Sequence, residues 1–134
     1  MIVVDTNIIS YLLIPNDTYN PLAEALYQKD SRWSSPFLWR YEFMSILSIY
    51  LRKNLIDAAG CKSIYKEAME LVVSRPILNF DAVFNIVQHS SLSSYDCEFV
   101  ALAMHSRLPL ITEDKKIIQE FPDFAFPIET YVRV

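Results

Sequence analysis

Four acidic residues of the sequence occur where a hydrophobic element begins, ends or faces its neighbours. Asp5 follows three consecutive β-branched residues, and Asp114 follows a second short apolar run. Glu42 and Asp96 fall within stretches whose apolar residues recur at helical spacing. A carboxylate that faces a hydrophobic core is costly unless it is paired or bound to a cation. If the four acids converge, they indicate a site for a hard divalent cation such as Mg²⁺ or Mn²⁺.

Each acid also has an ordinary structural role open to it. Asp5 and Asp114 can cap the helices expected to follow them, and Asp96 suits the first turn of a helix capped by Ser93. Glu42 would lie at a solvated margin if the core face of its helix were rotated away from it. No single acid justifies a functional claim, but one acid on each major element indicates a metal centre.

The reaction that such a centre favours is metal-assisted hydrolysis of a phosphodiester. A bound ion polarises the phosphoryl group, lowers the pKa of the attacking water and stabilises the leaving oxygen. The single glycine, Gly60, excludes a glycine-rich loop for nucleotide phosphates. Cys61 and Cys97 lack metal-ligand spacing with each other or with His89 and His105. We therefore expect no zinc site, and we interpret both cysteines as buried thiols in a reducing compartment.

The elements that must position these acids alternate between strands and helices. Strands are expected at residues 2–4, 31–35 and 109–112, with one or two edge strands in 124–132. Helices are expected from residue 5, 6 or 7 to 13, and at 21–29, 36–53, 57–74, 81–89, 93 or 94 to 106, and 114–120. This alternation predicts α/β layers around a mainly parallel sheet, whose ligands bind beyond the carboxyl ends of the strands. A chain of 134 residues is expected to form a single domain, 1–134.

Four segments of the chain carry a resemblance to a known family. They are residues 1–7 (MIVVDTN), Glu42 in the helix after Pro36, residues 94–103 (SYDCEFVALA) and residues 108–114 (LPLITED). Together they resemble the PIN-domain family, and within it the VapC-like toxins of bacterial and archaeal toxin–antitoxin pairs. The resemblance implies a PIN-like α/β/α sandwich with a central, mainly parallel sheet over nearly the whole chain.

The resemblance also implies an activity, a metal and partners. It implies a Mg²⁺- or Mn²⁺-dependent endoribonuclease that hydrolyses RNA phosphodiester bonds, a homodimer, and a cognate antitoxin that covers the acidic groove. The implied metal ligands are Asp5, Glu42, Asp96 and Asp114. Asn7 and Thr112 would support them, because an amide and a hydroxyl can orient carboxylates, water or the scissile phosphate. Lysines follow Asp114 where some family members carry a further acid, so the number of metal ions stays open.

The net charge of −4 is compatible with an RNA substrate if bound metal neutralises four of the 16 acidic residues, since 12 basic residues remain. The candidates for RNA contact are Arg40, Arg52, Lys53, Lys115, Lys116 and Arg107, each of which could equally lie on a solvated face. Trp39 is expected in the core. The N-terminus carries no secretory signal and no apolar run exceeds six residues, so we expect a cytoplasmic protein without a membrane span.

Two alternative functions remain open from the sequence. A haloacid-dehalogenase-like phosphatase also opens with a hydrophobic strand and an Asp, but it needs a second acid two residues later, where Asn7 stands. A non-catalytic PIN-like binding module would keep the fold and a partner surface without turnover. The presence of all four acids argues against this second alternative.

Overall fold

The computed structural model describes residues 1–76 and 79–133, and its centre is a sheet of parallel strands. The strands are β1 (Ile2–Val4), β2 (Trp33–Pro36), β3 (Val72–Arg75), β4 (Leu110–Ile111) and β5 (Ala125–Phe126). They lie in the order β3-β2-β1-β4-β5, and each pair of neighbours is parallel. All three residues of β1 are fully buried, as expected for a central strand covered on both faces.

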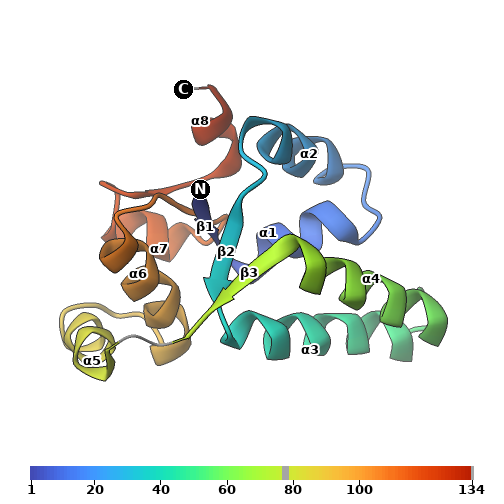
Figure 1. Cartoon of the computed structure of the whole chain (residues 1–134), viewed down its shortest axis with the longest axis horizontal. Helices are drawn as coiled ribbons and strands as arrows, with labels where there is room; N and C mark the ends of the chain where they lie inside the picture. Colours follow the sequence, from blue (N-terminus) through green and yellow to red (C-terminus); the bar gives the residue numbers. More distant parts are fainter. Residues whose placement is uncertain (77–78, 134) are drawn as a thin grey trace.

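Helices cover both faces of this sheet. They are α1 (Thr6–Leu13), α2 (Asn20–Lys29), α3 (Leu38–Arg52), α4 (Ala58–Leu71), α5 (Phe80–Gln88), α6 (Ser94–Ser106), α7 (Lys115–Glu120) and α8 (Ile128–Arg133). Figure 1 shows α5, α6 and α7 to the left of the strands and α1 to α4 to the right. Helix α6 packs on β1, β2 and β4, and α5 packs on α6. The predicted α/β sandwich with a central parallel sheet is confirmed.

Helix α3 buries a narrower face than its apolar residues indicate. Trp39, Phe43 and Leu47 recur every four residues and are almost completely buried, which confirms the core position expected for Trp39. Ile49 is 49% exposed, so the stripe that contains Glu42 does not face the core. Glu42 lies one position before Phe43, at the margin of the buried face.

Residues 72–75 differ from the sequence-based prediction, which continued the preceding helix to residue 74. They form the edge strand β3, in which Val72 pairs with Trp33 and Arg75 with Pro36 of β2. Val72 and Val73 are β-branched and suit a strand, whereas helical periodicity alone does not distinguish a buried Val72 in either element. Pro36 ends β2 instead of beginning the following helix.

The C-terminal segment also differs in part from its prediction. It contains the expected edge strand, β5, followed by the helix α8 in place of a second strand. Glu129 and Arg133 form an ion pair one turn apart on α8, which favours the helix. No helix in residues 1–76 and 79–133 is long and apolar enough to cross a membrane.

Candidate active site

Asp5 lies at the carboxyl end of the central strand, where the sheet fixes its backbone. Its backbone N–H donates to the Ile111 carbonyl of β4 at 2.9 Å, which places it directly beyond β1. The carboxylate caps α1, because Oδ1 accepts from the Thr6 backbone N–H at 2.7 Å. Only 9% of the residue is exposed. The capping role predicted for Asp5 is therefore present, and its second oxygen, Oδ2, is left for another contact.

Thr112 connects Asp5 to Asp114. The Thr112 hydroxyl donates to Asp5 Oδ2 at 2.7 Å and accepts from the Asp114 backbone N–H at 3.0 Å. Thr112 is completely buried just beyond β4. Because this one hydroxyl contacts both segments, the ends of β1 and β4 hold the two acids in a fixed relation.

Thr6 connects the same strand end to Glu42. Its hydroxyl donates to Glu42 Oε1 at 2.7 Å, across from α1 to α3. The sequence analysis did not single out Thr6, although its position directly after Asp5 is a signal that could have found it. Glu42 is half-buried, and this hydrogen bond ties its carboxylate to the first residue of α1, next to Asp5 in the chain.

Asp96 and Asp114 stand at the starts of two helices. Asp96 is in the first turn of α6, where its backbone N–H donates to the Ser93 hydroxyl at 3.1 Å. Asp114 caps α7, and its Oδ1 accepts from the backbone N–H groups of Lys116 and Ile117 at 2.9 and 3.3 Å. Both acids are half-buried. Their capping geometry matches the structural roles considered from the sequence.

The structure brings all four acids to one groove. Asp5, Glu42, Asp96 and Asp114 line it together with Thr6, Asn7 and three residues of α3, namely Ser45, Ile46 and Ile49. The volume of the groove is about 340 Å³. Asn7 is exposed on its wall, whereas Thr112 lies buried behind Asp5. The α3 stripe that contains Glu42 thus faces the groove, which explains why Ile49 is exposed.

The groove is electrostatically unfavourable without a cation. Burial raises the pKa of Asp5 to about 6 against the hydrogen bonds from Thr112 and Thr6, and the negative charges of Glu42 and Asp96 add to the rise. Burial and the charge of Asp96 raise the pKa of Glu42. Burial and then the charge of Asp114 raise the pKa of Asp96. These carboxylates repel one another, and a divalent cation would relieve that repulsion.

The donor set fits a hard cation, but the acids do not form a closed cage. Carboxylate oxygens are the ligands that Mg²⁺ and Mn²⁺ prefer. Within the described part of the chain, no three His, Cys, Asp or Glu side chains are placed to hold one metal ion together. Mg²⁺ commonly binds through one or two carboxylates and keeps several waters. The groove fits that mode of binding.

Lys116 is the basic candidate that the structure connects to the groove. Its positive charge lowers the pKa of Asp96, against the larger effects of burial and Asp114. Among the described residues that line the groove itself, none is basic.

Two other basic candidates have structural roles. Arg40 stacks on Phe37 and donates to the Ser74 hydroxyl at 3.2 Å. Arg107 forms the left-handed end of α6.

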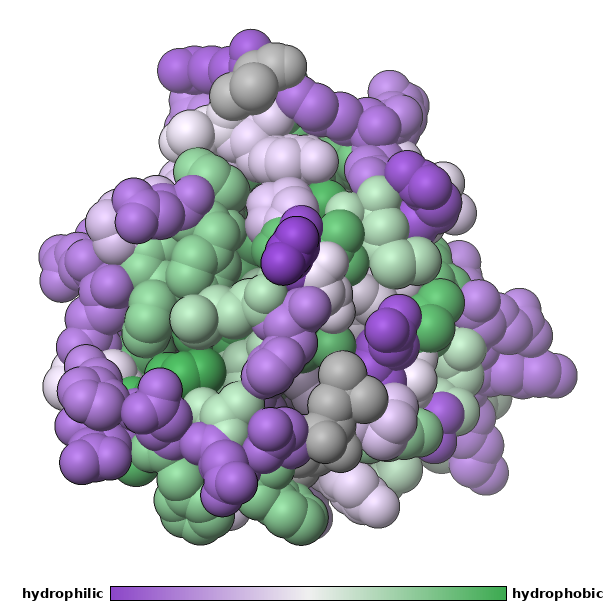
Figure 2. Space-filling view, turned by 60° about the vertical axis from the view of Figure 1, so that its left-hand side comes forward, coloured by the Kyte–Doolittle hydropathy of each residue, from purple (hydrophilic) through white to green (hydrophobic). Residues whose placement is uncertain are grey.

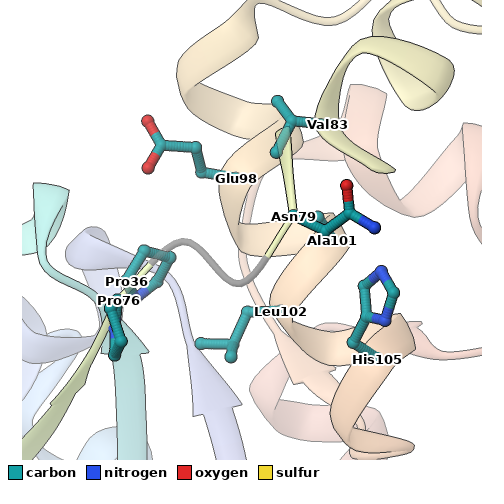
Figure 3. Close-up of a pocket in the computed structure, with 8 residues that line it drawn as sticks. All are labelled: Pro36, Pro76, Asn79, Val83, Glu98, Ala101, Leu102 and His105. Carbon is teal, nitrogen blue, oxygen red and sulfur yellow. The ribbon is translucent and has the colours of Figure 1, made fainter. Parts of the chain in front are cut away.

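A second pocket lies near the carboxyl ends of β2 and β3. It is lined by Pro36, Pro76, Asn79, Val83, Glu98, Ala101, Leu102 and His105. Figure 3 shows the Glu98 carboxylate pointing away from the His105 ring, although both residues belong to α6. The polar groups of this pocket do not converge on a common point, in contrast to the four acids of the groove.

The fold and the acidic groove define an α/β protein with a carboxylate site at the carboxyl edge of a parallel sheet. The PIN domain family model matches residues 2–123. The chain therefore belongs to the PIN-domain family, as the sequence motifs predicted. A comparison with curated proteins gives no match.

Three solved structures share the fold. The chain is 20% identical to PAE2754 from Pyrobaculum aerophilum, with a TM-score of 0.79 over 98% of this chain and 91% of the other. It is 18% identical to a chain of a toxin–antitoxin complex from Klebsiella pneumoniae, with a TM-score of 0.74 over 96% and 98%. It is 17% identical to a chain of FitAcB from Neisseria gonorrhoeae, with a TM-score of 0.63 over 96% and 99%.

Proposed function

We propose that this chain is a metal-dependent endoribonuclease that hydrolyses RNA phosphodiester bonds and serves as the toxin of a toxin–antitoxin pair. The observation that carries this proposal is the convergence of Asp5, Glu42, Asp96 and Asp114 on one groove. PIN domains are generally nucleases, so family membership supports the reaction class. We propose that residues 1–134 form one domain and act in the cytoplasm, where RNA is available.

The four acids would hold Mg²⁺ or Mn²⁺, with one or two of them as direct ligands at a time. The remaining acids would act through bound water, because no three of the described side chains are placed to hold one ion. This refines the set of four direct ligands that the resemblance implies. When bound, the ion would supply a polarised phosphoryl group and an activated water.

The uncharged residues of the site would orient these groups. Thr112 and Thr6 each fix one carboxylate by a hydrogen bond of 2.7 Å, which leaves the other lone pairs of Asp5 and Glu42 facing the groove. The exposed Asn7 amide would donate to a scissile phosphate or position a water. The Lys116 ammonium, near Asp96, would attract the phosphate backbone toward the rim of the groove.

A protein partner is part of the proposal. One of the structures that share this fold is a chain of a toxin–antitoxin complex from Klebsiella pneumoniae, which supports an antitoxin partner for this chain. The surface supports a partner, because a groove of about 560 Å³ between α3 and α4 is lined by apolar residues such as Met44, Leu51 and Met69. Phe80 and Phe84 of α5 are 71% and 68% exposed, and the face drawn in Figure 2 gathers hydrophobic residues on its left and lower parts. We propose a cognate antitoxin and a second copy of this chain as occupants of these surfaces.

Cleavage of labelled tRNA and rRNA fragments tests the proposed reaction. The purified chain would be assayed with Mn²⁺, Mg²⁺ or EDTA beside Asp96→Asn, with Asp17→Asn as a matched control on an exposed acid outside the groove. We expect metal-dependent cleavage by the parent and by Asp17→Asn, and a loss on the order of 100-fold in Asp96→Asn. Equal cleavage by all three proteins would give no support to a role for Asp96, because either the chain cleaves without it or a contaminating nuclease does the cutting.

One observation favours an alternative, a non-catalytic PIN-like binding module: no three His, Cys, Asp or Glu side chains of the described residues are placed to hold one metal ion. Such a module would keep the acidic groove without using it for turnover. It predicts that millimolar Mn²⁺ leaves the melting temperature unchanged, whereas a cation that binds the folded state raises it. A flat melting temperature together with no cleavage would favour the module over the nuclease.

A further inference from the structure

Ser91, in the turn between α5 and α6, has its N–H, hydroxyl and carbonyl groups hydrogen-bonded by two side chains of α7. Its backbone N–H donates to Glu120 Oε1 at 3.0 Å, and its hydroxyl donates to Glu120 Oε2 at 3.1 Å. Its carbonyl accepts from Lys116 Nζ at 3.2 Å. Lys116 and Glu120 are four residues apart and so project from the same side of α7. We call these three residues the Ser91 clamp.

The Ser91 clamp joins the turn before α6 to both ends of α7, and the two helices have different supports. Helix α6 packs chiefly on the sheet and on α5, whereas α7 packs chiefly on β5. Ser91 lies two residues before Ser93, whose hydroxyl caps the helix at Asp96. Lys116 lies two residues after Asp114, which caps α7. The clamp therefore links the segment that places Asp96 to the segment that places Asp114.

The contacts within the turn do not provide this link. Leu92 is 6% exposed and anchors the turn in the core, and the Ser90 hydroxyl accepts from the Leu92 backbone N–H at 3.3 Å. Cys97 contacts Ser90 and the Leu92 carbonyl from the next turn of α6. These contacts hold the turn against α6 itself. The connection from the turn to α7 comes from Glu120 and Lys116.

We propose that the Ser91 clamp sets the distance between Asp96 and Asp114, and that Glu120 and Lys116 are positioning residues for the divalent cation in the groove. The proposal rests on the metal site of the proposed function. An ion held by one or two carboxylates and by water depends strongly on where each carboxylate stands, because Mg²⁺ requires near-ideal geometry. Groups that orient metal-binding side chains typically change metal affinity by about 10- to 100-fold when they are removed.

The test compares Mn²⁺ binding by the full chain and by two Glu120 variants, measured as free Mn²⁺ by electron paramagnetic resonance during a titration. Glu120→Ala removes both contacts to Ser91, and we expect the Kd for Mn²⁺ to rise about tenfold, at the low end of that range because the clamp is exposed. Glu120→Gln removes the charge but keeps an acceptor for the Ser91 N–H and a donor for the Ser91 hydroxyl. We expect its Kd within about twofold of the parent, by the same reasoning.

Two further variants separate positioning from general stability. Glu129→Ala removes an exposed ion pair with Arg133 on α8 and is expected to bind Mn²⁺ like the parent. Ser91→Ala keeps the backbone contacts of the clamp and loses one hydrogen bond, so its Kd should lie between those of the parent and Glu120→Ala. A merely structural role for Glu120 would lower the metal-free melting temperature and leave the Kd unchanged.

Each outcome decides between these possibilities. Parent-like Mn²⁺ binding by Glu120→Ala overturns the clamp while leaving the proposed nuclease intact. Weak binding by both Glu120→Ala and Glu120→Gln assigns the effect to the charge of Glu120 and also overturns the clamp. If the parent chain itself binds no Mn²⁺, the proposed metal site fails and the clamp has no function to serve.

Discussion

The two halves of the acidic groove are built in different ways. Asp5 and Glu42 form a buried half, in which the hydroxyls of Thr112 and Thr6 each donate a hydrogen bond of 2.7 Å to a carboxylate. Asp96 and Asp114 form a more exposed half, in which both acids sit at helix starts. The buried half is fixed by the ends of β1 and β4 and by the first residue of α1, whereas the exposed half is fixed by caps and by surface side chains.

The two halves also differ in the electrostatic cost of keeping their carboxylates charged. The carboxylate with the largest rise in pKa is Asp5, in the buried half, because burial opposes its charge. In the exposed half, the buried residues Cys97 and Ile117 follow Asp96 and Asp114 closely and anchor the starts of α6 and α7 in the core. We infer that the buried half stores most of the electrostatic strain of the site.

The largest effect on stability should appear as a pH dependence that comes from Asp5. Its pKa rises from 3.8 to about 6 on folding, which corresponds to roughly 3 kcal/mol between its two protonation states. The unfolded chain therefore ionises Asp5 more readily. Relative to the unfolded chain, the folded chain is favoured most below pH 4, where Asp5 is protonated in both states. This contribution to the free energy of unfolding is lost as the pH rises through 6.

Urea unfolding in EDTA at pH 4 to 7 measures this dependence. We expect the free energy of unfolding of Asp5→Asn to fall much less over this range than that of the parent. Parallel curves for the two proteins would show that Asp5 is not the main source of strain, and the contrast between the halves would fail.

Thr112→Val should break the buried half directly. It removes the donor to Asp5 Oδ2 and the acceptor of the Asp114 backbone N–H. Among the described residues, no buried side-chain polar atom lacks a hydrogen-bond partner. The substitution would remove one hydrogen bond from the Asp5 carboxylate and one from the Asp114 N–H. We expect the free energy of unfolding to fall by about 2 kcal/mol. Thr130→Val, on the exposed side of α8, is the matched control and should change it by less than about 0.5 kcal/mol.

Ser93→Ala should disturb the exposed half by a smaller amount. It removes the side-chain cap that accepts from the Asp96 backbone N–H, at a cost of about 1 kcal/mol. Asp57→Ala removes the corresponding cap of α4, which accepts from the Gly60 backbone N–H at 2.7 Å. The two variants should lose similar stability in urea, but only Ser93→Ala should weaken Mn²⁺ binding. Equal Mn²⁺ binding by both would show that the cap of α6 does not position Asp96.

Arg107→Gly should give the smallest effect, at the end of α6 farthest from the groove. Arg107 has a φ of 56°, in the left-handed region that a side chain disfavours. Glycine relieves this strain but loses more backbone entropy, so we expect a gain of about 0.5 kcal/mol in the free energy of unfolding. Calorimetry and the cleavage assay together check the result. A loss of cleavage would make Arg107 an RNA contact, as the sequence allowed, and not only a helix end.

Much of the fold could be predicted because its signals are local. Three buried β-branched residues and a following acid locate β1 and its carboxyl end, and proline or serine residues delimit several of the helices. The strand at residues 72–75 could not be predicted with the same rules. Val72 is buried in either a helix or a strand, and only its pairing with Trp33 of β2 decides between them.

The acids of the groove could be identified from the sequence, but not the contacts that hold them. Glu42 was conspicuous because it interrupts an apolar stripe, yet the structure shows that this stripe faces the groove while Trp39 and Phe43 face the core. Glu120 gave no such signal, and Thr6 gave only that of its position directly after Asp5. Threonine and glutamate are ordinary at helix ends and surfaces, so their roles appear only when their partners are in place.

The sequence by itself determined the family, the alternation of strands and helices, and which four acids are candidates for the site, because these depend on neighbours along the chain. The tertiary structure decided that the acids share one groove and that Asp5 is the most buried of them. It also decided that a serine five residues before Asp96 is held by α7. These features depend on residues up to 107 positions apart, such as Asp5 and Thr112, and local sequence preferences do not encode the distance between such residues.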